Sequence, residues 1–159
     1  MKELYYVSGN EGKQKEVAYF FKHQFPEVQL TLCTIDLVEI QSLDQHSIAL
    51  NKAEQAWKLL KQPLLIDDSG FYFASYDRFP GTMSKFVFES LGFEGLTRLY
   101  NENDPASFDL TLIFMYGAST FQSFHVSISG KLTAPPPTHS SHLPYLKIFK
   151  PENSIHTLF

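Results

Sequence analysis

The first residues with a clear chemical potential follow an apolar run near the amino terminus. The run Leu4–Val7 stops at the small polar turn Ser8-Gly9-Asn10, and a helical pattern begins at once. Such a junction exposes the amide groups of a helix amino terminus, which attract anions. Ser8 adds a hydroxyl group, Asn10 an amide and Lys13 a positive charge. The segment predicts a phosphate-binding turn, although a capped helix with an incidental lysine explains it equally well.

Two adjacent acids form the second candidate. The apolar strand pattern Leu64–Ile66 leads directly into Asp67-Asp68-Ser69-Gly70. Two acids at the end of a buried strand are costly unless they face a cation or solvent, and α/β proteins place their sites at such strand ends. Mg²⁺ suits the pair, because it binds one or two carboxylates and takes further ligands from substrate phosphates. The alternative is a β-turn begun by Asp and continued by Ser-Gly, and this motif taken alone favours the turn.

Length and composition indicate one folded domain over residues 1–159. The chain is 43% hydrophobic and 15% aromatic, which is enough for a substantial core. A formal net charge of -4 argues against nonspecific nucleic-acid binding, which needs a basic surface. No apolar run reaches membrane-spanning length, and the first residues lack the pattern of a signal peptide. The one cysteine, Cys33, is expected to be a small buried hydrophobe. The expected location is therefore the reducing cytoplasm.

The elements that must position these residues alternate between strands and helices. One helix follows the first turn and ends near Phe25, and a second carries the apolar stripe Ala49, Ala53 and Ala56. Further helical patterns cover residues 86–91 and 96–100. Strands are predicted over residues 28–37, 64–66, 71–74, 109–116, 121–132 and 145–149, with 109–116 and 121–132 forming an antiparallel hairpin. This order predicts a mixed α/β domain.

Several motifs, taken in order along the chain, resemble the signature of the inosine triphosphate pyrophosphatase (Ham1-like) family. They are Ser8-Gly9-Asn10 with Lys13 and Glu16, Asp36-Leu37-Val38-Glu39-Ile40-Gln41, Ser47-Ile48-Ala49-Leu50-Asn51-Lys52-Ala53, Asp67-Asp68-Ser69-Gly70, Phe79-Pro80-Gly81 followed by Ser84-Lys85-Phe86, Glu94-Gly95-Leu96, and Ser129-Gly130-Lys131-Leu132 to Pro135. Each motif is modest alone, but their order and spacing over nearly the whole chain are specific. The resemblance implies a mixed, elongated central sheet flanked by helices.

The resemblance also implies an activity and a role for individual residues. The activity is hydrolysis of a purine nucleoside triphosphate between its α- and β-phosphates, with Mg²⁺ as cofactor. Asp68 would orient or deprotonate the attacking water, directly or through the metal. The implied metal ligands are Glu39, Asp67 and Asp68. The implied substrate contacts are Ser8, Asn10, Lys13, Lys52, Ser69, Lys85 and Tyr145. For Lys52, an ordinary exposed helix lysine is the alternative.

The resemblance fails at the segment that binds the base. Where the family carries an aromatic-Gly-aromatic-Asp-Pro pattern, this chain has Leu143-Pro144-Tyr145-Leu146. Leu143 stands in place of a stacking aromatic residue and Leu146 in place of the acid. Pro144 has neither the conformational freedom of glycine nor an amide hydrogen. The sequence also ends at Phe159, before the family's Ser-His-Arg motif and closing helix.

Two functions from different classes follow. The first is a pyrophosphohydrolase that removes aberrant purine triphosphates, such as those of inosine, deoxyinosine and xanthosine, from the nucleotide pool. The second is a catalytically weak homologue that binds nucleotides or dimerises, suggested by Leu143, Leu146 and the missing C-terminal motif. A natural chain longer than this sequence would also explain the missing motif.

A homodimer is expected from the resemblance and from the high aromatic content. The expected contact surface is the segment 79–88, with Met83, Phe86 and Phe88. An ordinary helix that packs these side chains inward is the alternative.

Overall fold

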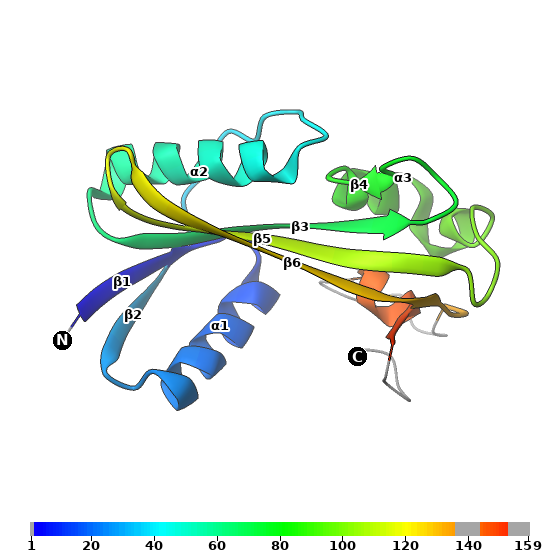
Figure 1. Ribbon diagram of the computed structural model, residues 1–159, viewed down its shortest axis with the longest axis horizontal. Helices are drawn as coiled ribbons and strands as arrows, with labels where there is room; N and C mark the ends of the chain where they lie inside the picture. The colour runs from blue at the N-terminus through cyan, green and yellow to red at the C-terminus, as the bar shows by residue number, and fades with distance from the viewer. Residues whose placement is uncertain (1, 136–143, 153–159) are drawn as a thin grey trace. The chain divides into compact units, whose positions relative to one another are not determined.

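The structure is a computed structural model that describes residues 2–135 and 144–152. Leu143 and the residues after 152 lie outside the described residues. In chain order the elements are β1 (Lys2–Val7), α1 (Glu11–Gln24), β2 (Val28–Cys33), α2 (Gln45–Leu60), β3 (Leu64–Phe73), β4 (Pro80–Gly81), α3 (Ser84–Leu96), β5 (Pro105–Gly117), β6 (Thr120–Leu132), the 3-10 helix η1 (Pro144–Ile148) and β7 (Phe149–Pro151) (Figure 1). This mixed α/β fold confirms the predicted class. Within the described residues, no helix is both long and apolar enough to cross a membrane.

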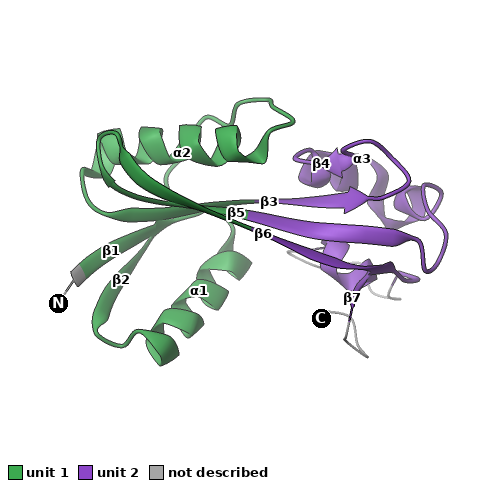
Figure 2. Cartoon of the chain, in the orientation of Figure 1, with its two compact units in different colours: residues 1–68, 111–125 green, residues 69–110, 126–159 purple. Residues whose placement is uncertain are grey.

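The described strands belong to one sheet in the order β2-β1-β3-β5-β6-β7, with β4 paired to β3. The chain divides into two compact units, and the long strands contribute residues to both (Figure 2). Unit 1 consists of residues 1–68 and 111–125, and unit 2 of residues 69–110 and 126–159. The predicted hairpin is confirmed, because β5 and β6 are neighbours joined by the two-residue connection 118–119.

Unit 1 combines the parallel strands β1, β2 and the start of β3 with the hairpin residues 111–125, and a helix covers each face of the parallel strands. β1 runs parallel to β2 along its whole length, and parallel to β3 at two register pairs, Tyr5↔Leu64 and Tyr6↔Leu65. The predicted alanine stripe of α2 packs on one face of these strands, with Ala49, Ala53 and Ala56 fully buried. Small side chains allow the helix axis to lie close to the sheet. α1 lies on the opposite face (Figure 1).

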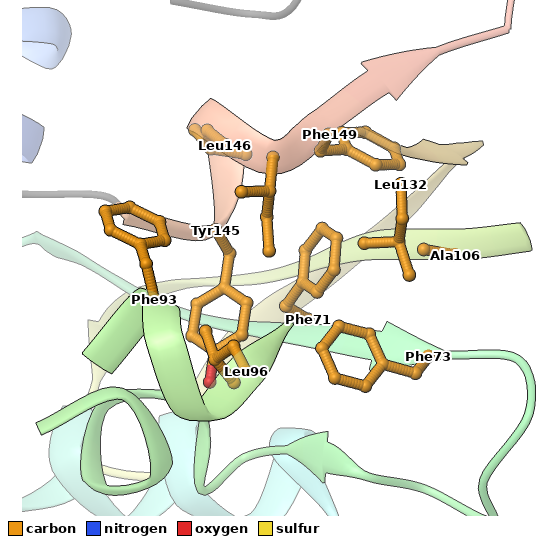
Figure 3. Close-up of a cluster of buried hydrophobic side chains, with 10 residues drawn as sticks. Phe71, Phe73, Phe93, Leu96, Ala106, Leu132, Tyr145, Leu146 and Phe149 are labelled. Carbon is orange, nitrogen blue, oxygen red and sulfur yellow. The ribbon is translucent and has the colours of Figure 1, made fainter. Parts of the chain in front are cut away.

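Unit 2 is organised around a cluster of aromatic and aliphatic side chains (Figure 3). Phe71 lies at its centre, within ring-contact distance of Phe73, Tyr145 and Phe149. Aromatic rings bury large areas and gain further from edge-to-face or offset contacts. These contacts therefore tie β3 to the C-terminal elements η1 and β7.

The predicted break between residues 66 and 71 is wrong, because β3 is one continuous ten-residue strand. Asp, Ser and Gly are common turn residues, so the residue types of Asp67-Asp68-Ser69-Gly70, taken alone, favour a turn. The backbone there stays extended because later residues keep sheet partners, with Phe71 paired to Gly81 and Tyr72 to Pro80. Both acids therefore lie within a strand, and neither begins a turn.

The predicted final strand over residues 145–149 is also wrong. Residues Pro144–Ile148 form the 3-10 helix η1, and only Phe149–Pro151 is extended. Proline has a fixed φ that suits the first turn of a helix, which explains the start at Pro144. The helical turn also buries Tyr145, Leu146 and Ile148 together, as strict alternation could not do for the adjacent pair.

Two other predicted elements have different bounds. The strand predicted over residues 28–37 ends at Cys33, where its partner β1 also ends. The separate helix predicted over 96–100 does not form. Instead, α3 runs from Ser84 to Leu96 with a kink at Gly92, whose φ of 59° is a left-handed value that glycine adopts readily.

We predict that Gly130→Ala destabilises the protein by about 2 kcal/mol through overpacking. A β-carbon at this buried position would meet the carbonyl oxygen of Lys150 and the ring of Phe149, since β6 and β7 pair here. Urea denaturation followed by circular dichroism measures the change. The neighbouring exposed residue Ser129 supplies the control, because Ser129→Ala should leave the midpoint unchanged. Equal stability of the two variants would contradict this packing.

Candidate active site

The two acids of β3 point to opposite faces of unit 1. Successive side chains of a strand alternate between faces, so Asp68 shares a face with Ile66, which packs in the core beneath α2. Asp67 shares the opposite face with Leu65, and its contact with Lys13 puts this face on the side of α1. Both acids follow the last residues of β3 that pair with β1. Their side chains are only 7% and 11% exposed, so each carboxylate needs a partner.

Lys13 of α1 is the partner of Asp67. Its ammonium nitrogen Nζ lies 2.5 Å from Oδ2 of Asp67. The other carboxylate oxygen, Oδ1, accepts a hydrogen bond from the hydroxyl of Tyr6. Both oxygens of Asp67 therefore have a donor in this state.

Lys52 of α2 is the partner of Asp68. Its Nζ lies 2.7 Å from Oδ1 of Asp68 and 3.1 Å from Oε2 of Glu39. The backbone carbonyl of Asp68 accepts a hydrogen bond from Nε2 of Gln45 at 2.6 Å, which fixes the strand at this point. Among the described residues, none donates a hydrogen bond to Oδ2 of Asp68. This oxygen is the one available to a water molecule or a metal ion.

Burial raises the pKa of the Asp68 carboxyl above its ordinary value, against the opposing effect of the Lys52 ammonium. Burial alone would lower the pKa of Lys52, but the carboxylates of Asp68 and Glu39 together outweigh it and raise that pKa. Lys52 faces two opposite charges, whereas Asp68 has one direct counter-charge and a like charge at Glu39. Lys52 is therefore held firmly as a cation.

The turn before α1 is placed as the sequence predicted. The side chain of Asn10 caps α1 by accepting from the amide of Lys13 at 3.2 Å, and the hydroxyl of Ser8 accepts from the amide of Asn10 at 3.2 Å. Nε2 of Gln14 donates to the carbonyl of Ser8 at 2.7 Å and to the hydroxyl of Thr34 at 3.1 Å, tying the turn to the chain after β2. The predicted helix cap is therefore present, and the side chain of Lys13 also contacts Asp67.

Sequence reasoning missed three supporting residues, Tyr6, Gln14 and Gln45. Tyr6 is one member of an apolar run, Gln14 belongs to a helical pattern, and Gln45 ends the polar stretch before the second helix, so none of the three stands out by a role of its own. Their roles depend on contacts with residues distant in the sequence, such as Tyr6 with Asp67. The one available signal was a tyrosine hydroxyl in a strand expected to be buried, which requires a partner.

The other predicted substrate contacts, Ser69, Lys85 and Tyr145, belong to unit 2. The side chain of Lys85 is 88% exposed and lies 3.9 Å from Glu89. Tyr145 is only 6% exposed: its ring stacks on Phe71 with centroids 5.1 Å apart, and its hydroxyl donates to the carbonyl of Ser84 (Figure 3). Tyr145 is therefore part of the core of unit 2. The contacts of Ser69, Lys85 and Tyr145 with substrate stay predictions.

The acids fit a divalent cation as a donor set. Within residues 2–135 and 144–152, no three His, Cys, Asp or Glu side chains lie together as a metal cage. Mg²⁺ does not need one, because it binds through one or two carboxylates with waters and substrate phosphates. Asp67 and Asp68 each already hold an ammonium group on a carboxylate oxygen, so each is placed to receive a cation. Glu39 is 59% exposed and adds an acid beside Lys52.

The fold and this arrangement of lysines, acids and a helix amino terminus define a class of α/β protein suited to binding phosphates. Residues 4–159 match the model of the Ham1 family, and the chain belongs to that family. Inosine triphosphate pyrophosphatase 2 of Trypanosoma cruzi (strain CL Brener) is 34% identical over 113 residues, which are 71% of this chain and 56% of that protein. The dITP/XTP pyrophosphatase of Methanopyrus kandleri is 29% identical over 152 residues, 94% of this chain and 79% of that protein.

Solved structures show the same fold. A HAM1 protein from Coxiella burnetii superposes with a TM-score of 0.70 at 21% identity, covering 94% of this chain and 81% of that one. The nucleoside-triphosphatase / dITP/XTP pyrophosphatase from Mycobacterium abscessus gives 0.69 at 18% identity, covering 98% and 86%. The chain nevertheless spans only 56% of the length of the trypanosomal relative.

We predict that Lys52→Met lowers the free energy of unfolding by about 3 kcal/mol, because it leaves the buried Asp68 carboxylate without its counter-charge. Adding Asp68→Asn to Lys52→Met should recover part of that loss, since the uncompensated charge is then gone. Urea denaturation of the single and double variants measures both effects. Lys85→Met is the control, because the exposed pair of Lys85 with Glu89 should contribute less than about 0.5 kcal/mol. Simple additivity of the two site substitutions would contradict the pairing.

Proposed function

We propose that this protein is a Mg²⁺-dependent pyrophosphohydrolase that converts aberrant purine nucleoside triphosphates to the monophosphate and pyrophosphate. The observation that carries the proposal is the convergence of Lys13 and Lys52, from two helices, on the adjacent acids Asp67 and Asp68. The names of the family relatives support the choice of inosine, deoxyinosine and xanthosine triphosphates as substrates. A cytoplasmic location is part of the proposal, because the single cysteine of this sequence permits no internal disulfide.

The two lysines would neutralise the substrate. A triphosphate carries several negative charges, and each ammonium group is now held by a carboxylate. When phosphate and Mg²⁺ enter together, the lysines would transfer to phosphate oxygens and the carboxylates to the metal, so every charge keeps a partner. The amino terminus of α1, next to Ser8 and Asn10, would add amide donors and a favourable dipole. Bound Mg²⁺ would stabilise phosphate charge and lower the pKa of a coordinated water.

The two acids would have different tasks. Both oxygens of Asp67 already accept from Tyr6 and Lys13, whereas Oδ2 of Asp68 has no donor among the described residues. Asp68 is therefore the residue we assign to hold the attacking water and to accept its proton. Burial raises the pKa of the Asp68 carboxyl, which makes it a stronger base than an exposed aspartate.

We predict that Asp68→Asn lowers kcat for pyrophosphate release by about 100-fold or more, because an amide cannot accept the proton. The measurement is pyrophosphate release from inosine, deoxyinosine, xanthosine, adenosine and guanosine triphosphates in the presence of Mg²⁺. The exposed residue Asp77 supplies the control, since Asp77→Asn changes the same functional group at a residue that is not part of the candidate site. Full turnover by Asp68→Asn would remove Asp68 from the mechanism.

A second candidate is a nucleotide-binding homologue with little activity. It is favoured by the C-terminal segment, where Tyr145 and Leu146 are each only 6% exposed and pack into the core of unit 2. Strong rejection of a wrong base requires a polar group that loses its partner, and a buried leucine supplies none. If wild-type protein binds triphosphates but releases pyrophosphate from none of them, this second function replaces the first.

We also propose that the protein forms a homodimer through α3 and the preceding turn. Phe86 is 68% exposed, whereas Phe79 and Phe88 pack against the core of unit 2. An exposed phenylalanine on a short helix is a suitable anchor for a partner subunit. We predict a dimeric mass by light scattering at micromolar concentration and a monomeric mass for Phe86→Glu. Exposed Glu89 supplies the control Glu89→Gln. A monomeric wild type would contradict this proposal.

A further inference from the structure

The tyrosine hydroxyl beneath the site is buried and has a specific partner. Tyr6 of β1 is 1% exposed, and its hydroxyl donates to Oδ1 of Asp67. A phenylalanine would fill the same space without placing a polar group in the core. Burying a hydroxyl is costly unless it is hydrogen-bonded. The hydrogen bond to Asp67 therefore explains why the hydroxyl is present. The reaction outlined above gives this hydrogen bond no role.

The two oxygens of Asp67 differ in how easily their donors can leave. Tyr6 belongs to a strand paired on both sides, to Leu32 of β2 and to Leu65 of β3, which fixes its backbone, and its ring is enclosed by the core. Lys13 is a long side chain on the first turn of α1, 18% exposed, and its Nζ lies 2.5 Å from Oδ2.

We propose that Tyr6 is a positioning residue that keeps Oδ1 of Asp67 occupied, so that only Oδ2 can exchange Lys13 for a divalent cation. The proposal deepens the metal site of the proposed function and rests on it. A carboxylate limited to one oxygen suits Mg²⁺, which is small and keeps near-octahedral geometry. Ca²⁺ takes six to eight oxygens and often binds carboxylates through both. Tyr6 thereby favours Mg²⁺ over Ca²⁺ at this site.

The test compares Tyr6→Phe with Tyr5→Phe. Tyr5 is the matched control, because it is the adjacent tyrosine on the other face of β1 and its hydroxyl donates to the exposed Glu3 at 3.0 Å. Mg²⁺ and Ca²⁺ alone are titrated separately into each metal-free protein without nucleotide. The unfolding temperature as a function of cation concentration gives each apparent affinity, since a ligand of the folded state stabilises it by mass action.

The expected result is that Tyr6→Phe shifts the ratio of Ca²⁺ to Mg²⁺ affinity about tenfold toward Ca²⁺, the scale typical of losing a group that orients a metal ligand. Tyr5→Phe should keep the wild-type ratio. An unchanged ratio in Tyr6→Phe would overturn the proposal, and so would the absence of saturable binding of either cation by wild type. Because no turnover is measured, the result is separate from the pyrophosphate-release assay that judges the proposed function.

Lys13→Met provides a second arm if Tyr6→Phe does not fold. This variant removes the group that competes for Oδ2 and leaves the contact between Tyr6 and Asp67 in place. Both cations should bind about tenfold more tightly, with their ratio unchanged. Unchanged affinities for both cations would show that Oδ2 is not the exchangeable oxygen, and the proposal would fail.

Discussion

The structure of unit 1 depends on one electrostatic constraint, the presence of two nearly buried carboxylates on adjacent residues of one strand. Strand alternation sends Asp67 and Asp68 to opposite faces, and in the ligand-free protein each is paired with its own lysine. A helix on each face supplies a lysine, Lys13 from α1 and Lys52 from α2. Without these lysines the acids would carry a large desolvation cost. The positions of both helices are thereby tied to the acids, and so is the chemistry of the site.

The same constraint explains why the proposed phosphate-binding groups and the candidate metal ligands form one system. Each lysine that would bind phosphate is neutralised by an acid that would bind a cation, so neither aspartate is an isolated buried charge. A triphosphate with Mg²⁺ offers equivalent charges of both signs and can replace these internal contacts. Gln45 donates to the backbone carbonyl of Asp68 and Tyr6 to the carboxylate of Asp67, and these bonds from uncharged donors need not change during the exchange. Preorganised dipoles of this kind are the usual basis of electrostatic catalysis.

Much of unit 1 could be predicted from sequence because its signals are local. The turn before α1, the alanine stripe of α2 and the hairpin of β5 and β6 all follow from short patterns, and the structure has them. The continuity of β3 could not be predicted, because the extended backbone at Asp67 to Gly70 depends on strand partners elsewhere in the chain. The 3-10 helix at Tyr145 likewise depends on packing against Phe71. Pairing of Lys13 with Asp67 joins residues 54 positions apart, and a motif match could suggest the residues but not the contact.

The most direct test of this account is a crystal structure of the protein with Mg²⁺ and a non-hydrolysable inosine triphosphate analogue. The account predicts that Nζ of Lys13 and Nζ of Lys52 leave the aspartates and bind phosphate oxygens. It also predicts that Asp67 and Asp68 then hold the cation, while the hydrogen bond from Tyr6 to Asp67 persists. A complex in which both lysine–aspartate pairs remain intact and the triphosphate binds elsewhere would contradict it.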